Sequence, residues 1–167
     1  MTEPDLDAHA RELMNVNRYI TIGTADADGT PWVSPVYFAA ADESPEIFWV
    51  SALDSTHSRN IASRPDVSMV IFDSTVRPYY GRAVYLSGRA AELAGPDLER
   101  AVGIYPGAAS RQASSVTVAD VSAPSDYRLY RATVTEASVL CTREPRAACP
   151  LHGIAADHRT PVMPWRS

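Results

Sequence analysis

The chain has 167 residues, a formal net charge of −5 and a sequence pI of about 5.3. The length suits one domain, and the acidic balance argues against nucleic acid as the main partner, because phosphate backbones are bound by basic surfaces. All fifteen residues counted as Lys or Arg are arginines, which excludes a Schiff-base lysine and the phosphate-binding lysine of a P-loop.

The chain opens with a helical pattern and continues with strand patterns. Apolar side chains recur at helical spacing between residues 5 and 18, at Leu6, Ala10, Leu13 and Met14, which predicts one amphipathic helix. The period then changes to two, which is typical of strands. The expected strands, in chain order, are 19–25, 32–39, 46–52, 66–74, 81–93 and 127–140.

Turn and helix signals separate these strands. Asp28-Gly29 predicts a hairpin after the first strand, Pro35 predicts an edge strand or a bulge, and Gly88 predicts a bulge in the fifth strand. Strand 46–52 is apolar on both faces, so we expect it to be central. Further elements are expected as short helices at 56–63 and 96–105, a polar loop at 107–115 and a helical turn at 117–121.

Six strands joined mostly by hairpins predict a mainly β (α+β) fold. We expect a six-stranded split β-barrel with a few short flanking helices. Residues 1–141 form the predicted barrel domain. Residues 142–167 contain four prolines and no period, which predicts an irregular C-terminal tail.

Composition also suggests a compartment. No apolar run approaches the ~20 residues that cross a bilayer, and the start of the chain, MTEPDLDAHARE, is acidic and polar, unlike a secretory signal. We therefore expect a cytoplasmic protein with no membrane partner, in which Cys141 and Cys149 are thiols.

The stretch STHSRNIASRP, residues 55–65, directly follows an apolar strand end. A helix N-terminus presents free N–H groups and a partial positive charge, which together favour an anion. Ser55, Thr56 and Ser58 would add hydroxyl donors in the first turn. Two interpretations stay open: Ser55 only caps the helix, or the stretch binds a phosphate group.

The order of these pieces resembles the pyridoxamine 5′-phosphate oxidase-like, FMN-binding split-barrel family. The resemblance runs from about residue 11 to residue 140. It implies a homodimer with FMN bound at the subunit interface and, if the protein is an enzyme, a flavin-dependent oxidoreductase acting on a small-molecule substrate. The segments that carry it are YITIGTADADGTPWVSPVYF, IFWVSALDSTHSRNIASRPDVSMVIF and the expected strand 81–93, which ends in YLSGRAAEL.

The resemblance also implies cofactor-binding residues, although it singles out no catalytic one. Family members often have Arg or Lys where Thr56 and His57 stand, so charge pairing with a phosphate would be weaker here. The implied phosphate contacts are Ser51, Ser55, Thr56, His57 and Arg59. The implied ring contacts are Val33, Ser34, Pro35, Val36 and the backbone of Trp49 and Val50, with a residue near Arg82 reaching across from the other subunit.

Two rival functions fit the same barrel. A deazaflavin-dependent reductase would need a wider basic groove for its longer acidic cofactor, which Arg59, Arg64 and Arg77 would supply. A non-catalytic flavin or haem binder is the second rival. Haem would need an axial ligand, for which the candidates are His57, His152 and His158.

The tail carries four residues of metal-binding type, Cys141, Cys149, His152 and His158. Their spacing, C-x₇-C-x₂-H-x₅-H, matches no standard zinc pattern. From the sequence alone we therefore expect a tail without a metal site.

Overall fold

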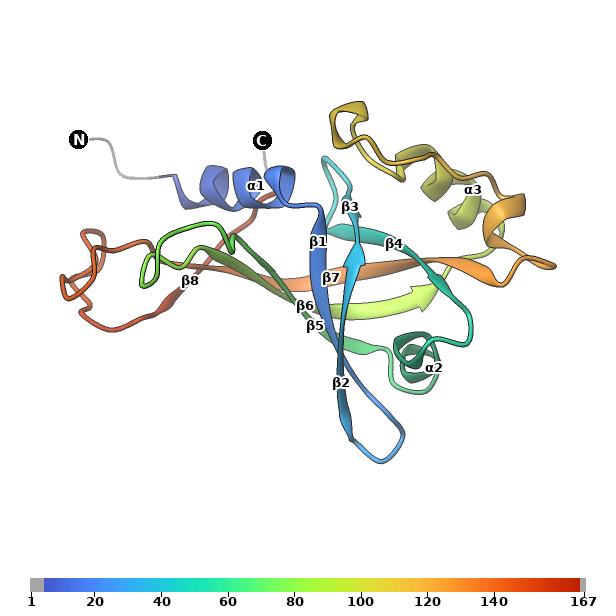
Figure 1. Ribbon diagram of the computed structural model, residues 1–167, viewed down its shortest axis with the longest axis horizontal. Coiled ribbons are helices and arrows are strands. Elements are labelled where there is room, and N and C mark those ends of the chain that lie inside the picture. The colour runs from blue at the N-terminus through green and yellow to red at the C-terminus, as the bar shows by residue number, and fades with distance from the viewer. Residues whose placement is uncertain (1–4, 166–167) are drawn as a thin grey trace.

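The computed structural model describes residues 5–165; residues 1–4 and 166–167, the outer ends of the predicted domain and tail, lie outside the described residues. One long antiparallel sheet curls into a half-barrel with helices around it (Figure 1). The helices are α1 (Leu6–Val16), α2 (Thr56–Ser63) and α3 (Gly95–Ile104), with 3₁₀ turns η1 (Ala109–Arg111) and η2 (Ala119–Val121). The strands are β1 (Tyr19–Ala25), β2 (Pro31–Tyr37), β3 (Ala39–Ala40), β4 (Glu46–Ala52), β5 (Asp66–Phe72), β6 (Ala83–Glu92), β7 (Tyr127–Leu140) and β8 (Arg159–Pro161).

The strand order is β2-β1-β5-β6-β7-β4-β3, and β8 pairs with β7. The predicted split barrel is confirmed. The predicted bounds of β1, β4, α2 and β7 agree with the structure. Two short strands were missed: β3, which continues after β2, and β8, which lies inside the predicted irregular tail.

The β1–β2 hairpin forms as its turn residues predict. The Asp26 carboxylate accepts hydrogen bonds from the backbone N–H groups of Asp28 and Thr30, and Gly29 adopts φ +90°. Among residues 5–165, β1 is the only strand that pairs with β2, so β2 is an edge strand. An edge is the position that Pro35 tolerates.

The position of β4 differs from the central place that its composition predicts. β4 is flanked by β7 and by the two-residue β3, close to one end of the strand order. Both of its faces are nevertheless buried, because it separates two clusters of side chains. Ile47 and Trp49 pack into the main barrel core, whereas Phe48 packs into a second cluster with Leu98 of α3.

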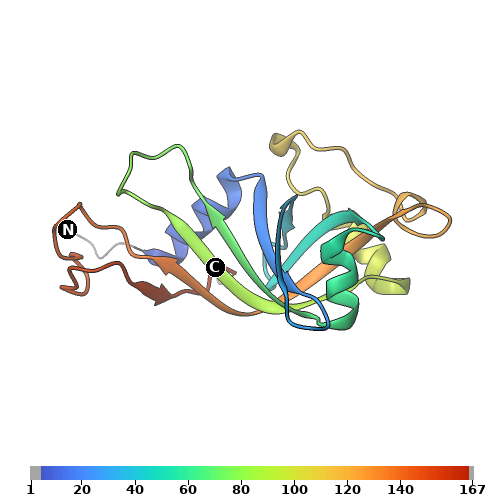
Figure 2. The ribbon, with the colours of Figure 1, turned by 60° about the horizontal axis from the view of Figure 1, so that its bottom comes forward.

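The sheet is long, and its two ends carry different segments. The loop between β5 and β6 and the tail after β7 lie together at one end, while α2 and α3 lie toward the other (Figures 1 and 2). Within the described residues no helix is long and apolar enough to span a membrane.

Candidate functional site

The open side of the half-barrel lies between β2 and β4. These two strands contact each other, but no hydrogen-bonded ladder joins them in the described chain. β3 pairs only with Ile47 and Phe48, so the edge of β4 from Trp49 onward has no strand partner there. Two strand edges with unpaired backbone groups therefore face a common seam, which we call the β2–β4 seam.

His57 of α2 bridges this seam. Its Nδ1 lies 3.1 Å from the hydroxyl of Ser34 on β2, and its Nε2 lies 2.7 Å from the hydroxyl of Ser51 on β4. The imidazole is buried, with 8% of its surface exposed. Three residues predicted as separate cofactor contacts thus form one hydrogen-bonded unit.

Burial lowers the pKa of His57 below its ordinary value, so the ring is neutral near pH 7. A neutral imidazole donates from one nitrogen and accepts at the other. Trp32 Nε1 donates to the Ser34 hydroxyl, whose oxygen can accept a second hydrogen bond and whose proton can be donated. One of the two serines therefore donates to His57 and the other accepts from it, and the tautomer of the ring decides which.

The N-terminus of α2 lies at the same place. The Ser55 side chain accepts from the backbone N–H of Ser58, so the predicted cap is present. The N–H groups of Thr56 and His57 have no hydrogen-bond partner among the described residues. Capping therefore leaves two donors of the first turn for an anion.

The cationic part of this end is Arg59. Its guanidinium is exposed and reaches the Asp54 carbonyl and, at 3.5 Å, the Thr56 hydroxyl. Because His57 is neutral, Arg59 is the positive side chain that the predicted phosphate contacts supply. The cap interpretation and the phosphate interpretation are thus compatible in one structure.

The predicted ring contacts divide by exposure. Val33 is 66% exposed and Pro35 is exposed, on the same face of β2. Val36 and Trp49 point into the core, so only their backbone can contact a ligand. Val50 is half-buried on β4.

Arg82 lies apart from these residues, at the start of β6 beside the loop that occupies the opposite end of the sheet from α2 (Figure 1). It lines a hollow of about 900 Å³ together with Tyr79, Cys141 and Arg143. Two further hollows, of about 1030 and 700 Å³, contain none of the predicted cofactor residues. The expectation that Arg82 serves the neighbouring subunit stays a prediction.

Two residues of this region have roles that the sequence did not reveal. Asn60 is buried and donates to the Thr24 hydroxyl of β1, which fixes α2 to the barrel. In the sequence, its only signal was its position on the same helix face as His57.

Arg111, in the predicted polar loop, donates to four backbone carbonyls around the end of α1 and to Tyr37, and no local sequence pattern indicates this role. The carbonyls belong to Met14, Asn15, Asn17 and Phe38.

Comparison with known families decides the classification. The family model of pyridoxamine 5′-phosphate oxidase matches residues 6–141, most of the chain. The chain belongs to the pyridoxamine 5′-phosphate oxidase family. No curated protein matches the chain.

Solved structures with this fold include haem proteins. A haem-binding protein from Mycobacterium smegmatis has 18% identity and a TM-score of 0.67; the alignment covers 96% of this chain and 60% of that one. The haem storage protein HutZ from Vibrio cholerae has 16% identity and a TM-score of 0.57, with 78% and 91% covered. A putative pyridoxamine 5′-phosphate oxidase from Listeria innocua has 10% identity and a TM-score of 0.60, with 81% and 98% covered. At these identities the similarity establishes the fold alone.

Proposed function

We propose that this chain binds FMN at the β2–β4 seam. The observation that carries the proposal is the pair of unpaired strand edges that meet at the N-terminus of α2. A ring whose edge holds several hydrogen-bond donors and acceptors suits two free backbone edges, and a phosphate suits the helix end. The same place offers both.

The phosphate would be held by three kinds of donor: backbone N–H groups, hydroxyls and a guanidinium. These are the free N–H groups of Thr56 and His57, the hydroxyls of Thr56 and Ser51, and the Arg59 guanidinium. A hydrogen bond to a charged acceptor is about twice as strong as a neutral one. This donor set offsets the absence of the second basic side chain that the family often has.

The ring would lie against the exposed apolar face of Val33 and Pro35. FMN, when bound, supplies hydride transfer. The chain's own residues bind and orient the cofactor, and the neutral His57 holds β2 and β4 at a fixed separation. The oxidoreductase activity and its small-molecule substrate depend on this binding and stay predictions.

We also propose that the chain works as a homodimer. Its accessible surface is 9794 Å², whereas a compact monomer of 18.1 kDa exposes about 8,100 Å². The excess, about 1,700 Å², is roughly twice the ~800 Å² that a standard protein–protein interface removes from each partner, so there is surface enough for a second subunit to cover. A second subunit would cover part of this surface and complete the seam from the other side.

Haem is the second candidate, and the comparisons favour it, because two similar structures belong to haem proteins. Within the seam the fit is poorer. Both ring nitrogens of His57 are already hydrogen-bonded to serines, so that imidazole is not free for iron. His152 and His158 lie in the tail, at the opposite end of the sheet from α2.

A paired-variant titration tests FMN binding. Thr56→Ala combined with Arg59→Ala removes a hydroxyl and a guanidinium from one phosphate, and we expect FMN affinity to fall by roughly 10- to 100-fold, about 1.5–3 kcal/mol. Flavin fluorescence quenching measures it. Ser63→Ala combined with Arg64→Ala likewise removes one hydroxyl and one guanidinium, at the other end of α2, and should leave the affinity unchanged. Equal affinities in both double variants would place the phosphate elsewhere.

The haem candidate has its own test. Titration with hemin should give no Soret shift in the FMN-binding protein. The opposite result is stoichiometric hemin binding with a Soret band that either His152→Ala or His158→Ala alone abolishes. That result would identify haem rather than FMN as the cofactor. A deazaflavin is indicated if neither FMN nor hemin binds and the deazaflavin cofactor does.

A further inference from the structure

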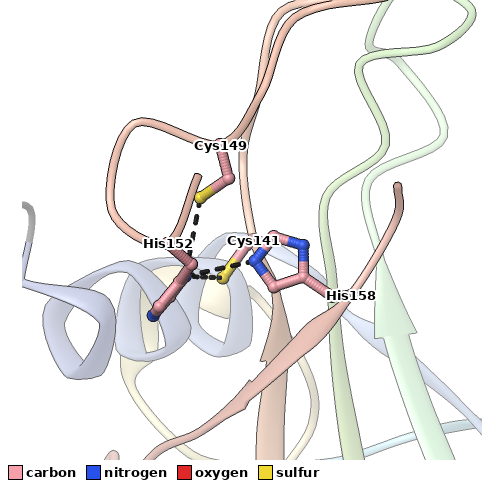
Figure 3. A group of neighbouring side chains, drawn as sticks. All are labelled: Cys141, Cys149, His152 and His158. Atoms are coloured by element: carbon pink, nitrogen blue, oxygen red, sulfur yellow. Dashed lines mark hydrogen bonds between the residues drawn. The ribbon is translucent and has the colours of Figure 1, made fainter. Parts of the chain in front are cut away.

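The tail brings four metal-binding side chains together, away from the β2–β4 seam. Cys141, Cys149, His152 and His158 each turn one ligand atom toward the others (Figure 3). These four atoms all lie within 4.8 Å of one another. The spacing in the sequence had given no reason to expect this.

The three distances from His152 Nδ1 to the other ligand atoms are close to those of a tetrahedral site with two sulfur and two nitrogen ligands. His152 Nδ1 lies 3.7 Å from the Cys141 sulfur, 3.5 Å from the Cys149 sulfur and 3.1 Å from His158 Nε2. Zinc with bonds of about 2.3 Å to sulfur and about 2.0–2.1 Å to nitrogen would set these separations at roughly 3.6 Å and 3.3 Å.

The tautomer of His158 also suits a metal. Its Nδ1 lies 3.0 Å from the carbonyl oxygen of Ala156, and a carbonyl can only accept, so Nδ1 carries the proton. The lone pair is therefore on Nε2, the atom that faces the cluster. A backbone acceptor on the far nitrogen is the usual support of a metal-bound histidine.

Hydrogen bonds alone satisfy this group poorly. If His152 Nδ1 carries a proton, it can donate that proton to His158 Nε2. The two cysteine sulfurs then receive no hydrogen bond from His152 Nδ1. If it carries none, it faces the lone pair of His158 Nε2 at 3.1 Å. One cation at the centre satisfies all four lone pairs.

The fold explains why the spacing is unusual. Leu140 of β7 pairs with Arg159 of β8, and the Cys141 N–H donates to the His158 carbonyl, so the ladder places these two ligands side by side. Cys149 and His152 come from one tight turn, in which the Gly153 N–H donates to the Cys149 carbonyl and Gly153 adopts φ +67°. The ligands thus come from the residue after β7, a turn, and the residue before β8.

The segment 142–158 is held by polar contacts, among them an ion pair between Arg143 and Asp157 and a hydrogen bond from Tyr80 to Glu144, and by little apolar packing. Among its residues only Cys149 is buried, so apolar packing contributes little to its order. Long loops without such packing are usually mobile or functional. A metal that joins Cys149 and His152 to β7 and β8 would fix the segment against the sheet.

We propose that Cys141, Cys149, His152 and His158 bind one structural zinc ion. Two thiolates and two imidazoles in a tetrahedron select zinc among the common divalent cations. All four positions are filled by protein, so the ion would hold the tail in place rather than activate water. The Thr160 hydroxyl, 2.9 Å from the Cys141 sulfur, would donate to the thiolate as an outer support.

Cobalt substitution tests this in the full chain. One equivalent of Co²⁺ added to the metal-free, reduced protein should give the intense visible bands of a tetrahedral thiolate site, and one equivalent of Zn²⁺ should abolish them. Cys149→Ser and His152→Ala should each lose the bands, while His9→Ala should keep them. Absence of the bands, or their survival in both ligand variants, would overturn the proposal.

A second measurement avoids variants that fail to fold. In wild-type protein loaded with Zn²⁺, both thiols should resist a thiol reagent until a chelator is added. Thr160→Val should weaken zinc affinity by roughly 10- to 100-fold, whereas Thr142→Val, an exposed residue beside the same cysteine, should not. Thiols that react equally fast with and without zinc, or a Cys141–Cys149 disulfide in the purified protein, would contradict a zinc site.

Discussion

At the scale of single residues, His57 joins two strands that no backbone ladder connects. Its ring contacts Ser34 and Ser51 from a buried position. The family resemblance implied that His57 contacts a phosphate. The structure gives the histidine a neutral ring that fixes the width of the seam.

His57 predicts a pH dependence of stability. The unfolded chain binds a proton at this residue near pH 6.5, about its ordinary pKa, whereas burial lowers the pKa in the fold. Below about pH 6.5 the unfolded state therefore binds more protons, and acidification lowers the free energy of unfolding. Urea denaturation at pH 7.5 and pH 5.5 should show a smaller loss in His57→Gln than in wild type.

His9 needs a control in that experiment, because burial and then Arg82 lower its pKa too. His9→Gln should remove its own share of the pH dependence and leave that of His57. If His57→Gln and wild type lose the same stability on acidification, the His57 ring is not held neutral by the fold.

At the scale of elements, the bulge in β6 leaves the least room for a side chain. The register shifts between Ser87 and Gly88, and a Cβ on Gly88 would lie 2.3 Å from the carbonyl oxygen of Thr133 on β7. That atom belongs to the sheet backbone and cannot move without breaking the ladder. The glycine is required there by close approach.

Gly88→Ala should therefore destabilise the fold by about 1–3 kcal/mol. Gly103→Ala is the matched control: it lies in α3, where a Cβ meets nothing within 4 Å, and it should stabilise the helix by about 0.5–1 kcal/mol. Thermal denaturation of both variants measures the difference. A Gly88→Ala protein as stable as wild type would mean that the bulge relaxes in solution.

Local patterns predicted most of these elements. Alternation located β1, a short apolar run located β4, and the turn residues located the first hairpin, because each signal lies within a few residues. The position of β4 was predicted wrongly because a strand can be buried on both faces in two ways: by lying in the middle of a sheet, or by packing against a second cluster of side chains. In this chain α3 provides that second cluster. β8 was missed because three residues carry no period.

The candidate site was only partly predictable for a related reason. The segments 33–36 and 49–59 were both identified, but the hydrogen bonds from His57 to Ser34 and Ser51 depend on how the sheet curls. The Cys141–His158 cluster depends on the pairing of β7 with β8. Contacts that long-range pairing creates leave no spacing in the sequence to recognise.

At the scale of the whole molecule, the half-barrel separates two places with different tasks. The β2–β4 seam and α2 lie toward one end of the sheet, and the cysteine–histidine cluster lies at the other (Figure 1). Cofactor binding at the seam and zinc binding in the tail are therefore independent proposals, and the failure of one would not contradict the other. The proposed dimer bears on the seam, which a second subunit would complete.

The most direct test of the account is the visible spectrum of the purified chain after FMN is added and the protein is passed through a gel-filtration column. We expect a two-banded flavin spectrum that elutes with a dimer, at one FMN per chain. A colourless protein after FMN addition, or one that takes up hemin with a Soret band in its place, would contradict FMN binding at the β2–β4 seam.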